Sequence, residues 1–172
     1  MRDAFSETGR APRMSPIRLI GIGSPFGDDR VGWHAVEAIE RSGMLASFPA
    51  GMATACRCSH PVTDLLPMMS GARAVFLIDG MKSGAPPGAV RRIEDGELPD
   101  GLGNVSSHGL GVAESLALAR TLGMLPRTLT IYGIEIGAPA ADQEISQAVL
   151  AAIPALLREI ETDLRRLVEE ND

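Results

Sequence analysis

The chain of 172 residues lacks the composition that marks several large classes of protein. Its 16 Lys and Arg residues are outnumbered by 22 Asp and Glu, which gives a formal net charge of −6. A nucleic-acid partner bound through a basic surface is therefore not expected. Aromatic residues make up 3% of the chain, too few to define a binding hot spot.

Cysteines and long apolar runs are also scarce. The two cysteines, Cys56 and Cys58, are separated by one residue. That spacing would strain a disulfide, so we expect reduced thiols and a cytoplasmic location. No stretch approaches the roughly 20 apolar residues of a membrane helix, and no membrane partner is expected. Residues 1–16 lack the apolar centre of a secretory signal. We expect them to be a disordered extension and residues 17–170 to form one domain.

Several enzyme motifs are missing as well. The chain has no His-Glu-x-x-His zinc helix, no Walker phosphate loop and no Gly-x-Ser-x-Gly elbow. The Gly21-x-Gly23 turn keeps open a nucleotide-binding domain, which predicts a dinucleotide at the first helix. The third glycine of that fingerprint is displaced, however, and Asp28 and Asp29 would repel phosphate.

What the chain does contain is an alternation of apolar strand patterns and helical patterns, which indicates an α/β fold with helices on both faces of a sheet. The nearly continuous apolar run 74–78 is typical of a central strand. Strands are expected from Ile17, near 51–58, and at 74–78, 89–94 and 128–136, with helices up to Ile39, around 63–69, at 106–123 and at 145–167. Pro154 should kink the last helix or split it.

Three side chains suited to metal chemistry fall where an expected strand ends or an expected helix begins: Asp29, Asp79 and His108. Each also has an ordinary structural interpretation. Asp28 or Asp29 can cap a helix, Asp79 before a glycine is typical of a turn, and His108 suits a surface position. Ser106 and Ser107 favour a capping role over that of a serine nucleophile.

Four segments together resemble the nickel-iron hydrogenase maturation proteases. They are Gly-Ile-Gly-Ser-Pro-Phe-Gly-Asp-Asp-Arg-Val-Gly (21–32), Leu-Ile-Asp-Gly-Met-Lys-Ser-Gly (77–84) with the following Pro-Gly, Ser-Ser-His-Gly-Leu (106–110) and Tyr-Gly-Ile-Glu (132–135). A Gly-x-Gly turn alone is a weak signal. All four occur in the family's order and spacing, from about residue 17 to residue 160.

The resemblance implies a three-layer α/β/α sandwich, phosphorylase/hydrolase-like, with a five-stranded mixed sheet of order 2-1-3-5-4 and strand 4 antiparallel. It also implies an endopeptidase, aspartyl-type, that removes the C-terminal extension of a hydrogenase large-subunit precursor after nickel insertion. The family's metal-contacting positions fall on Asp29, Asp79 and His108, which would be the catalytic and metal residues. Nickel would arrive with the precursor, and no organic cofactor is expected.

Chemistry supports these assignments. Strands 1 and 3 would leave in opposite directions from a switch point, where open α/β sheets place ligands. Asp29, Asp79 and His108 then supply two oxygens and one nitrogen, an open set suited to a borderline divalent ion. As a hypothesis, the metal either activates the scissile carbonyl or a water, with Asp29 or Asp79 as base, or it only docks the precursor. A non-proteolytic metal-binding chaperone or scaffold is the alternative function.

The chain departs from the family pattern at two places. Ser24 stands where Asn is usual, and Cys56-Arg-Cys58-Ser-His60-Pro replaces a Gly-rich turn after strand 2. Thiolate and imidazole are good nickel or zinc ligands, so Cys58 and His60 are possible additional ligands. Burial as a small apolar residue is the favoured interpretation of Cys58.

Overall fold

The computed structural model describes residues 17–94, 109–137 and 144–170. These contain a five-stranded sheet with the order β2-β1-β3-β5-β4. Strands β1, β2, β3 and β5 run parallel, and β4 pairs antiparallel with β5, which confirms the predicted order and the reversed strand. The strand bounds are β1 Ile17–Ile22, β2 Ala53–Cys58, β3 Ala74–Met81, β4 Val90–Glu94 and β5 Thr128–Glu135. The expected extension 1–16 lies outside the described residues.

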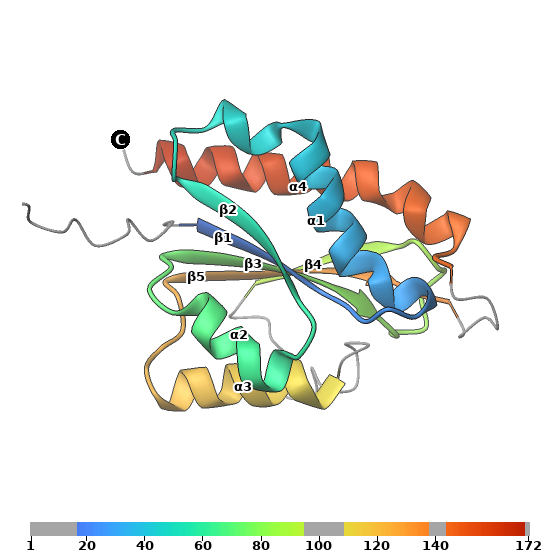
Figure 1. The fold of residues 1–172 in the computed structure, drawn as a ribbon, viewed down its shortest axis with the longest axis horizontal. Helices are drawn as coiled ribbons and strands as arrows, with labels where there is room; N and C mark the ends of the chain where they lie inside the picture. Colours follow the sequence, from blue (N-terminus) through green and yellow to red (C-terminus); the bar gives the residue numbers. More distant parts are fainter. Residues whose placement is uncertain (1–16, 95–108, 138–143, 171–172) are drawn as a thin grey trace, which may run out of the picture.

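Helices cover both faces of the sheet, which makes the predicted three-layer sandwich. Figure 1 shows α1 and α4 on one face and α2 and α3 on the other. Their bounds are α1 Val31–Ser42, α2 Pro61–Met69, α3 Gly109–Thr121 and α4 Gln147–Glu169, with short 3-10 helices η1 Gly27–Arg30 and η2 Met44–Ser47. In the part of the chain that the structure covers, no helix is long and apolar enough to cross a membrane.

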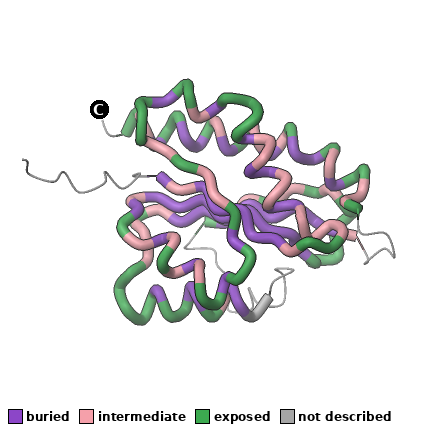
Figure 2. The backbone as a smooth tube through the Cα atoms, in the orientation of Figure 1, coloured by how far each residue is buried: buried purple, intermediate pink, exposed green. Residues whose placement is uncertain are grey.

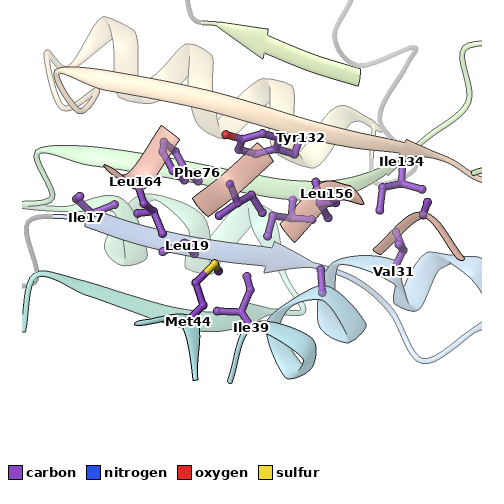
Figure 3. Packing of buried hydrophobic residues seen from close by; sticks show 14 of the residues in the cluster. Ile17, Leu19, Val31, Ile39, Met44, Phe76, Tyr132, Ile134, Leu156 and Leu164 are labelled. Atoms are coloured by element: carbon purple, nitrogen blue, oxygen red, sulfur yellow. The ribbon is translucent and has the colours of Figure 1, made fainter. Parts of the chain in front are cut away.

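The sheet separates two apolar cores. Every residue of β3 is buried, as predicted for a central strand, and the tube in Figure 2 is most continuously buried along the sheet. Between the sheet and the helices α1 and α4, Phe76 packs edge to face on Tyr132 with ring centroids 5.6 Å apart. Figure 3 shows these rings with Leu156 and Leu164 of α4 and Ile39 of α1.

Strand β3 is longer than the sequence pattern indicates. It continues through Asp79 and Gly80 to Met81, because these residues pair with Gly133 and the two residues after it in β5. The interpretation of Asp79 as a turn former is therefore wrong. Pairing with a long neighbouring strand overrides the local preference of an Asp-Gly sequence.

Helix α4 is one continuous helix of 23 residues, so Pro154 does not split it, and the kink stays a prediction. Pro154 is exposed, and the carbonyl that loses its hydrogen bond can therefore bind water. The opposite face is buried along the whole helix, from Val149 to Leu167. Burial of this face outweighs the cost of one proline.

A buried polar cluster also holds α4 to the sheet. The Tyr132 hydroxyl donates a hydrogen bond to Asp163 Oδ2. Arg92 Nε donates to the same oxygen over 2.6 Å. Burial and the hydrogen bond to Asp163 raise the pKa of Tyr132. Asp163 thus joins α4 to both β4 and β5.

The start of α1 lies directly on the end of β1, backbone against backbone. A Cβ added at Gly21 would stand 2.1 Å from the Gly32 carbonyl oxygen, and one added at Gly32 would stand 2.0 Å from the Ile22 oxygen and 2.6 Å from the Ile78 oxygen. Only glycine fits both positions. The contact brings the first turn of α1 onto the ends of both β1 and β3.

Gly32→Ala should therefore destabilise the protein, although alanine is the better helix former by about 1 kcal/mol. The added methyl meets main-chain atoms that cannot rotate away, so we expect a loss of about 3 kcal/mol or more. Urea unfolding measures it. The control Glu40→Ala, at an exposed position of α1, should change stability by no more than about 0.5 kcal/mol. Equal midpoints for Gly32→Ala and the wild type would contradict the close contact.

Candidate functional site

The candidate site lies at the carboxyl ends of β1 and β3, where the strand order reverses. β1 leads outward to β2, whereas β3 leads the other way to β5, so this is the topological switch point of the sheet. Helix η1, which carries Asp29, packs against β3, which carries Asp79. The structure therefore brings the segments of these two predicted site residues to the same end of the sheet.

Asp29 is partly buried and its backbone is held within its own loop. Its N–H donates to the Phe26 oxygen at 3.1 Å, and its carbonyl accepts from the Ser24 N–H at 3.1 Å. The carboxylate oxygen Oδ1 is buried without a hydrogen-bond partner among the residues that the structure covers. A buried acceptor without a donor is costly, and a cation would relieve that cost.

The expected helix-capping role of the two aspartates is wrong. Neither η1 nor α1 has a side-chain hydrogen bond at its first turn, and the N-cap positions are Phe26 and Arg30. Asp28 instead accepts hydrogen bonds from Gly137 and Ser146, far along the chain. The two acids therefore have different surroundings although they are neighbours in sequence.

Asp79 is almost completely buried, with 2% of its surface exposed. Its Oδ1 accepts from the Gly80 N–H at 2.8 Å. Residues two positions away on either side, Leu77 and Met81, belong to the core under α2 and α3. Because side chains alternate along a strand, Asp79 projects toward that same face.

Glu135, at the end of β5, is a second buried acid at this end of the sheet, beside the partly buried Asp29. Its Oε2 accepts from Ser83 N–H at 3.0 Å and Ser83 Oγ at 2.7 Å, and its Oε1 accepts from Gly84 N–H at 2.8 Å. Burial raises the pKa of this carboxyl, but the hydrogen bonds outweigh it and leave the pKa below its ordinary value. In the sequence, Glu135 stands out only as the last residue of the Tyr-Gly-Ile-Glu segment. The pattern that could have identified it is a single acidic residue at the end of an apolar strand.

The lowered pKa of Glu135 predicts acid sensitivity. The carboxylate contributes stability that is fully present above its ordinary value of 4.5 and is lost as pH falls toward the folded-state pKa. Glu135→Gln should cost about 1–3 kcal/mol at neutral pH and should flatten the decline below pH 4.5.

Urea midpoints measured across this acid range test the prediction. Ser83→Ala removes only the hydroxyl donor and keeps the main-chain donors, so it should flatten the profile less than Glu135→Gln. Parallel pH profiles for Glu135→Gln and the wild type would contradict the assigned role.

His108 lies outside the described residues, as do Ser106 and Ser107. The helix that follows, α3, begins at Gly109 and packs its first turn on the start of α2. A Cβ at Gly111 would stand 3.1 Å from Val62, and the Ser115 hydroxyl donates to the Pro61 carbonyl at 2.8 Å. Within residues 17–94, 109–137 and 144–170, no group of three or more His, Cys, Asp and Glu side chains could hold a metal. The three-ligand set stays a prediction.

The contacts of Cys58 favour packing over metal ligation. Its side chain is buried in the core under α2 and α3. Burial raises the pKa of its thiol to about 11, above the level at which a thiolate forms near neutral pH, and the negative charge of Asp79 adds to the shift. The His60 side chain is 79% exposed, with Nδ1 3.8 Å from Asp64 Oδ2. The buried thiol and the exposed imidazole thus lie in different surroundings.

This architecture, with acids at the switch point of the sheet, defines an α/β protein with a candidate carboxylate site. A family model described as hydrogenase maturation protease (HycI) matches residues 61–163. The chain belongs to the hydrogenase maturation protease family.

Two curated relatives illustrate the similarity. The hydrogenase expression/formation protein HupD of Thiocapsa roseopersicina is 32% identical over 122 residues, which cover 69% of this chain and 53% of HupD. The chain thus spans about half of that relative. The hydrogenase 2 maturation protease of Escherichia coli (strain K12) is 27% identical over 160 residues, which cover 83% of this chain and 91% of the relative.

A solved structure shows the same fold. The hydrogenase maturating endopeptidase HybD from E. coli superimposes with a TM-score of 0.72 at 22% sequence identity, over 87% of this chain and 92% of that chain. This similarity confirms the five-stranded α/β/α architecture.

Proposed function

We propose that the protein is an endopeptidase that removes the C-terminal extension of a nickel-iron hydrogenase large-subunit precursor after nickel insertion. Membership of the family supports the reaction class. The observation that carries the proposal is the buried Asp29 Oδ1, which has no hydrogen-bond partner among the described residues, in a helix packed against the strand of Asp79.

The nickel belongs to the substrate in this proposal. Asp29 and Asp79 supply oxygen ligands from the two sides of the switch point, and His108 supplies a nitrogen from the segment just before α3. Such a mixed and incomplete set suits a borderline divalent ion that already has other ligands. Cleavage is thereby restricted to precursors into which nickel has been inserted.

The residues then divide the chemistry of amide hydrolysis. A water oxygen forms the new bond to the scissile carbonyl carbon, and the carbon–nitrogen bond breaks. Asp29 accepts the proton of that water and returns it to the departing amine nitrogen. Asp79, fixed within a fully buried strand, holds the precursor's metal in place and so orients the scissile bond. Electrostatic anchoring of this kind requires a rigid carboxylate.

The reduced state of Cys56 and Cys58 supports the cytoplasm as the place of action, since disulfides are rare there. The overall negative charge of the chain also favours a precursor that presents a cation.

Asp79→Asn keeps the side-chain shape and the oxygen that accepts from Gly80, but it removes the charge. We expect it to slow cleavage by at least about 100-fold, as should Asp29→Asn. Intact mass of the source organism's large-subunit precursor, nickel-loaded or empty, measures the loss of the extension. Wild-type protein should shorten only the loaded precursor.

Glu37→Gln is the control, because Glu37 lies on α1 and pairs with Arg57 at the surface; it should cleave at the wild-type rate. Tight binding of loaded precursor without shortening would favour the chaperone function. Equal cleavage of loaded and empty precursor would contradict recognition of nickel.

A further inference from the structure

The first acid of the Asp28–Asp29 pair is bound by segments that lie more than 100 residues further along the chain. Asp28 Oδ1 accepts from the Ser146 N–H at 2.6 Å, and Asp28 Oδ2 accepts from the Gly137 N–H at 3.0 Å and the Ser146 hydroxyl at 3.1 Å. Both carboxylate oxygens are therefore used, and two of the three donors are main-chain groups. Hydrogen bonds to a charged acceptor are about twice as strong as neutral ones.

The two donor residues lie at ends of large elements. Gly137 lies just after β5, and Ser146 is the N-cap of α4, where its Oγ also accepts from the Val149 N–H at 3.5 Å. A negative charge at the start of a helix is further stabilised by the helix dipole. One carboxylate from η1 thus joins the end of β5 to the beginning of the longest helix.

Helix η1 is otherwise held by two backbone hydrogen bonds of Asp29 within its own loop and by packing on α1 and β3. It is four residues long, has no side-chain cap, and contains no fully buried residue. Short 3-10 helices have poor internal hydrogen bonding, so the orientation of η1 depends on contacts with its surroundings. The contact with Gly32 holds the C-terminal end of the segment, and Asp28 holds its middle.

We propose that Asp28 is a positioning residue that fixes η1 between β5 and α4, so that Asp29 presents its carboxylate beside Asp79. The inference rests on the proposed function in one respect, since the position of Asp29 is measured through the rate of precursor cleavage. Asp28 touches neither substrate nor metal; it acts through its neighbour. The adjacent acids of the pair have separate roles.

Asp28→Ala removes all three hydrogen bonds at once. We expect cleavage of nickel-loaded precursor to slow by about 10- to 100-fold, the effect of moving a reacting group by about 1 Å. Asp28→Asn keeps one acceptor oxygen, so it should slow cleavage less than Asp28→Ala does. Amide hydrogen exchange at Gly137 and Ser146 should speed up in Asp28→Ala, while the core strands keep wild-type protection.

The matched control is Asp163→Asn. Like the partly buried Asp28, the buried Asp163 accepts hydrogen bonds from residues distant in sequence, but it joins α4 to β4 and β5 away from η1. Rates are compared at a temperature at which circular dichroism shows each variant to be folded. Asp163→Asn should lower stability and leave the rate per folded molecule within about twofold of wild type.

A double-mutant cycle separates positioning from general loosening. If Asp28 acts through Asp29, Asp28→Ala should slow the Asp29→Asn protein by less than about twofold, whereas it slows the wild type at least tenfold. Equal slowing in both backgrounds, or an unchanged rate in Asp28→Ala, would overturn the proposal. If wild-type protein leaves loaded precursor intact, the proposed function fails instead. Unchanged exchange at Gly137 and Ser146 would then overturn the anchoring by Asp28 independently.

Discussion

The contact between Gly21 and Gly32 is the constraint on which the site depends. Two glycines let the backbone of α1 lie on the ends of β1 and β3 at distances that any Cβ would forbid. The chain between them has to turn sharply within ten residues, and η1 is the result. Because η1 is short, the close approach of α1 draws Asp29 to the switch point of the sheet. The position of the acid site therefore depends on close backbone packing at Gly21 and Gly32, two residues without a reactive side chain.

Carboxylates that are wholly or partly buried have two distinct tasks in this protein. Asp28, Glu135 and Asp163 each accept several hydrogen bonds and join segments far apart in the chain. In each, the donors compensate the cost of burying charge. Asp29 differs, because one of its oxygens is buried without a donor in the part of the chain that the structure covers. Asp28, Glu135 and Asp163 hold the surrounding loops in place. In the proposed function, the carboxylate of Asp29 binds a cation that the precursor delivers.

The patterns that span several residues were predicted correctly from the sequence, whereas local preferences were overridden. The apolar run at 74–78 identified β3 as the central strand, and the missing helix between β3 and β4 indicated an antiparallel strand. The Asp-Gly at 79–80 suggested a turn, but pairing with β5 keeps those residues in the strand. Pro154 suggested a break, but the buried face of α4 maintains the helix. The aspartate pair suggested helix caps, since nothing local reveals that Gly137 and Ser146 come close.

The sequence by itself determined the layers of the fold and the three residues predicted to bind a metal, because periodicity and motif order are properties of the chain alone. Only the tertiary structure decided which acid of the Asp28–Asp29 pair joins segments and which has a carboxylate oxygen buried without a donor among the described residues. It also revealed Glu135 as the acceptor for the loop after β3 and Cys58 as a buried thiol. The physical reason is that hydrogen-bond satisfaction is a property of residues brought together from distant positions. A carboxylate's role depends on which donors reach it, and those donors are fixed only when β5 and α4 are in place.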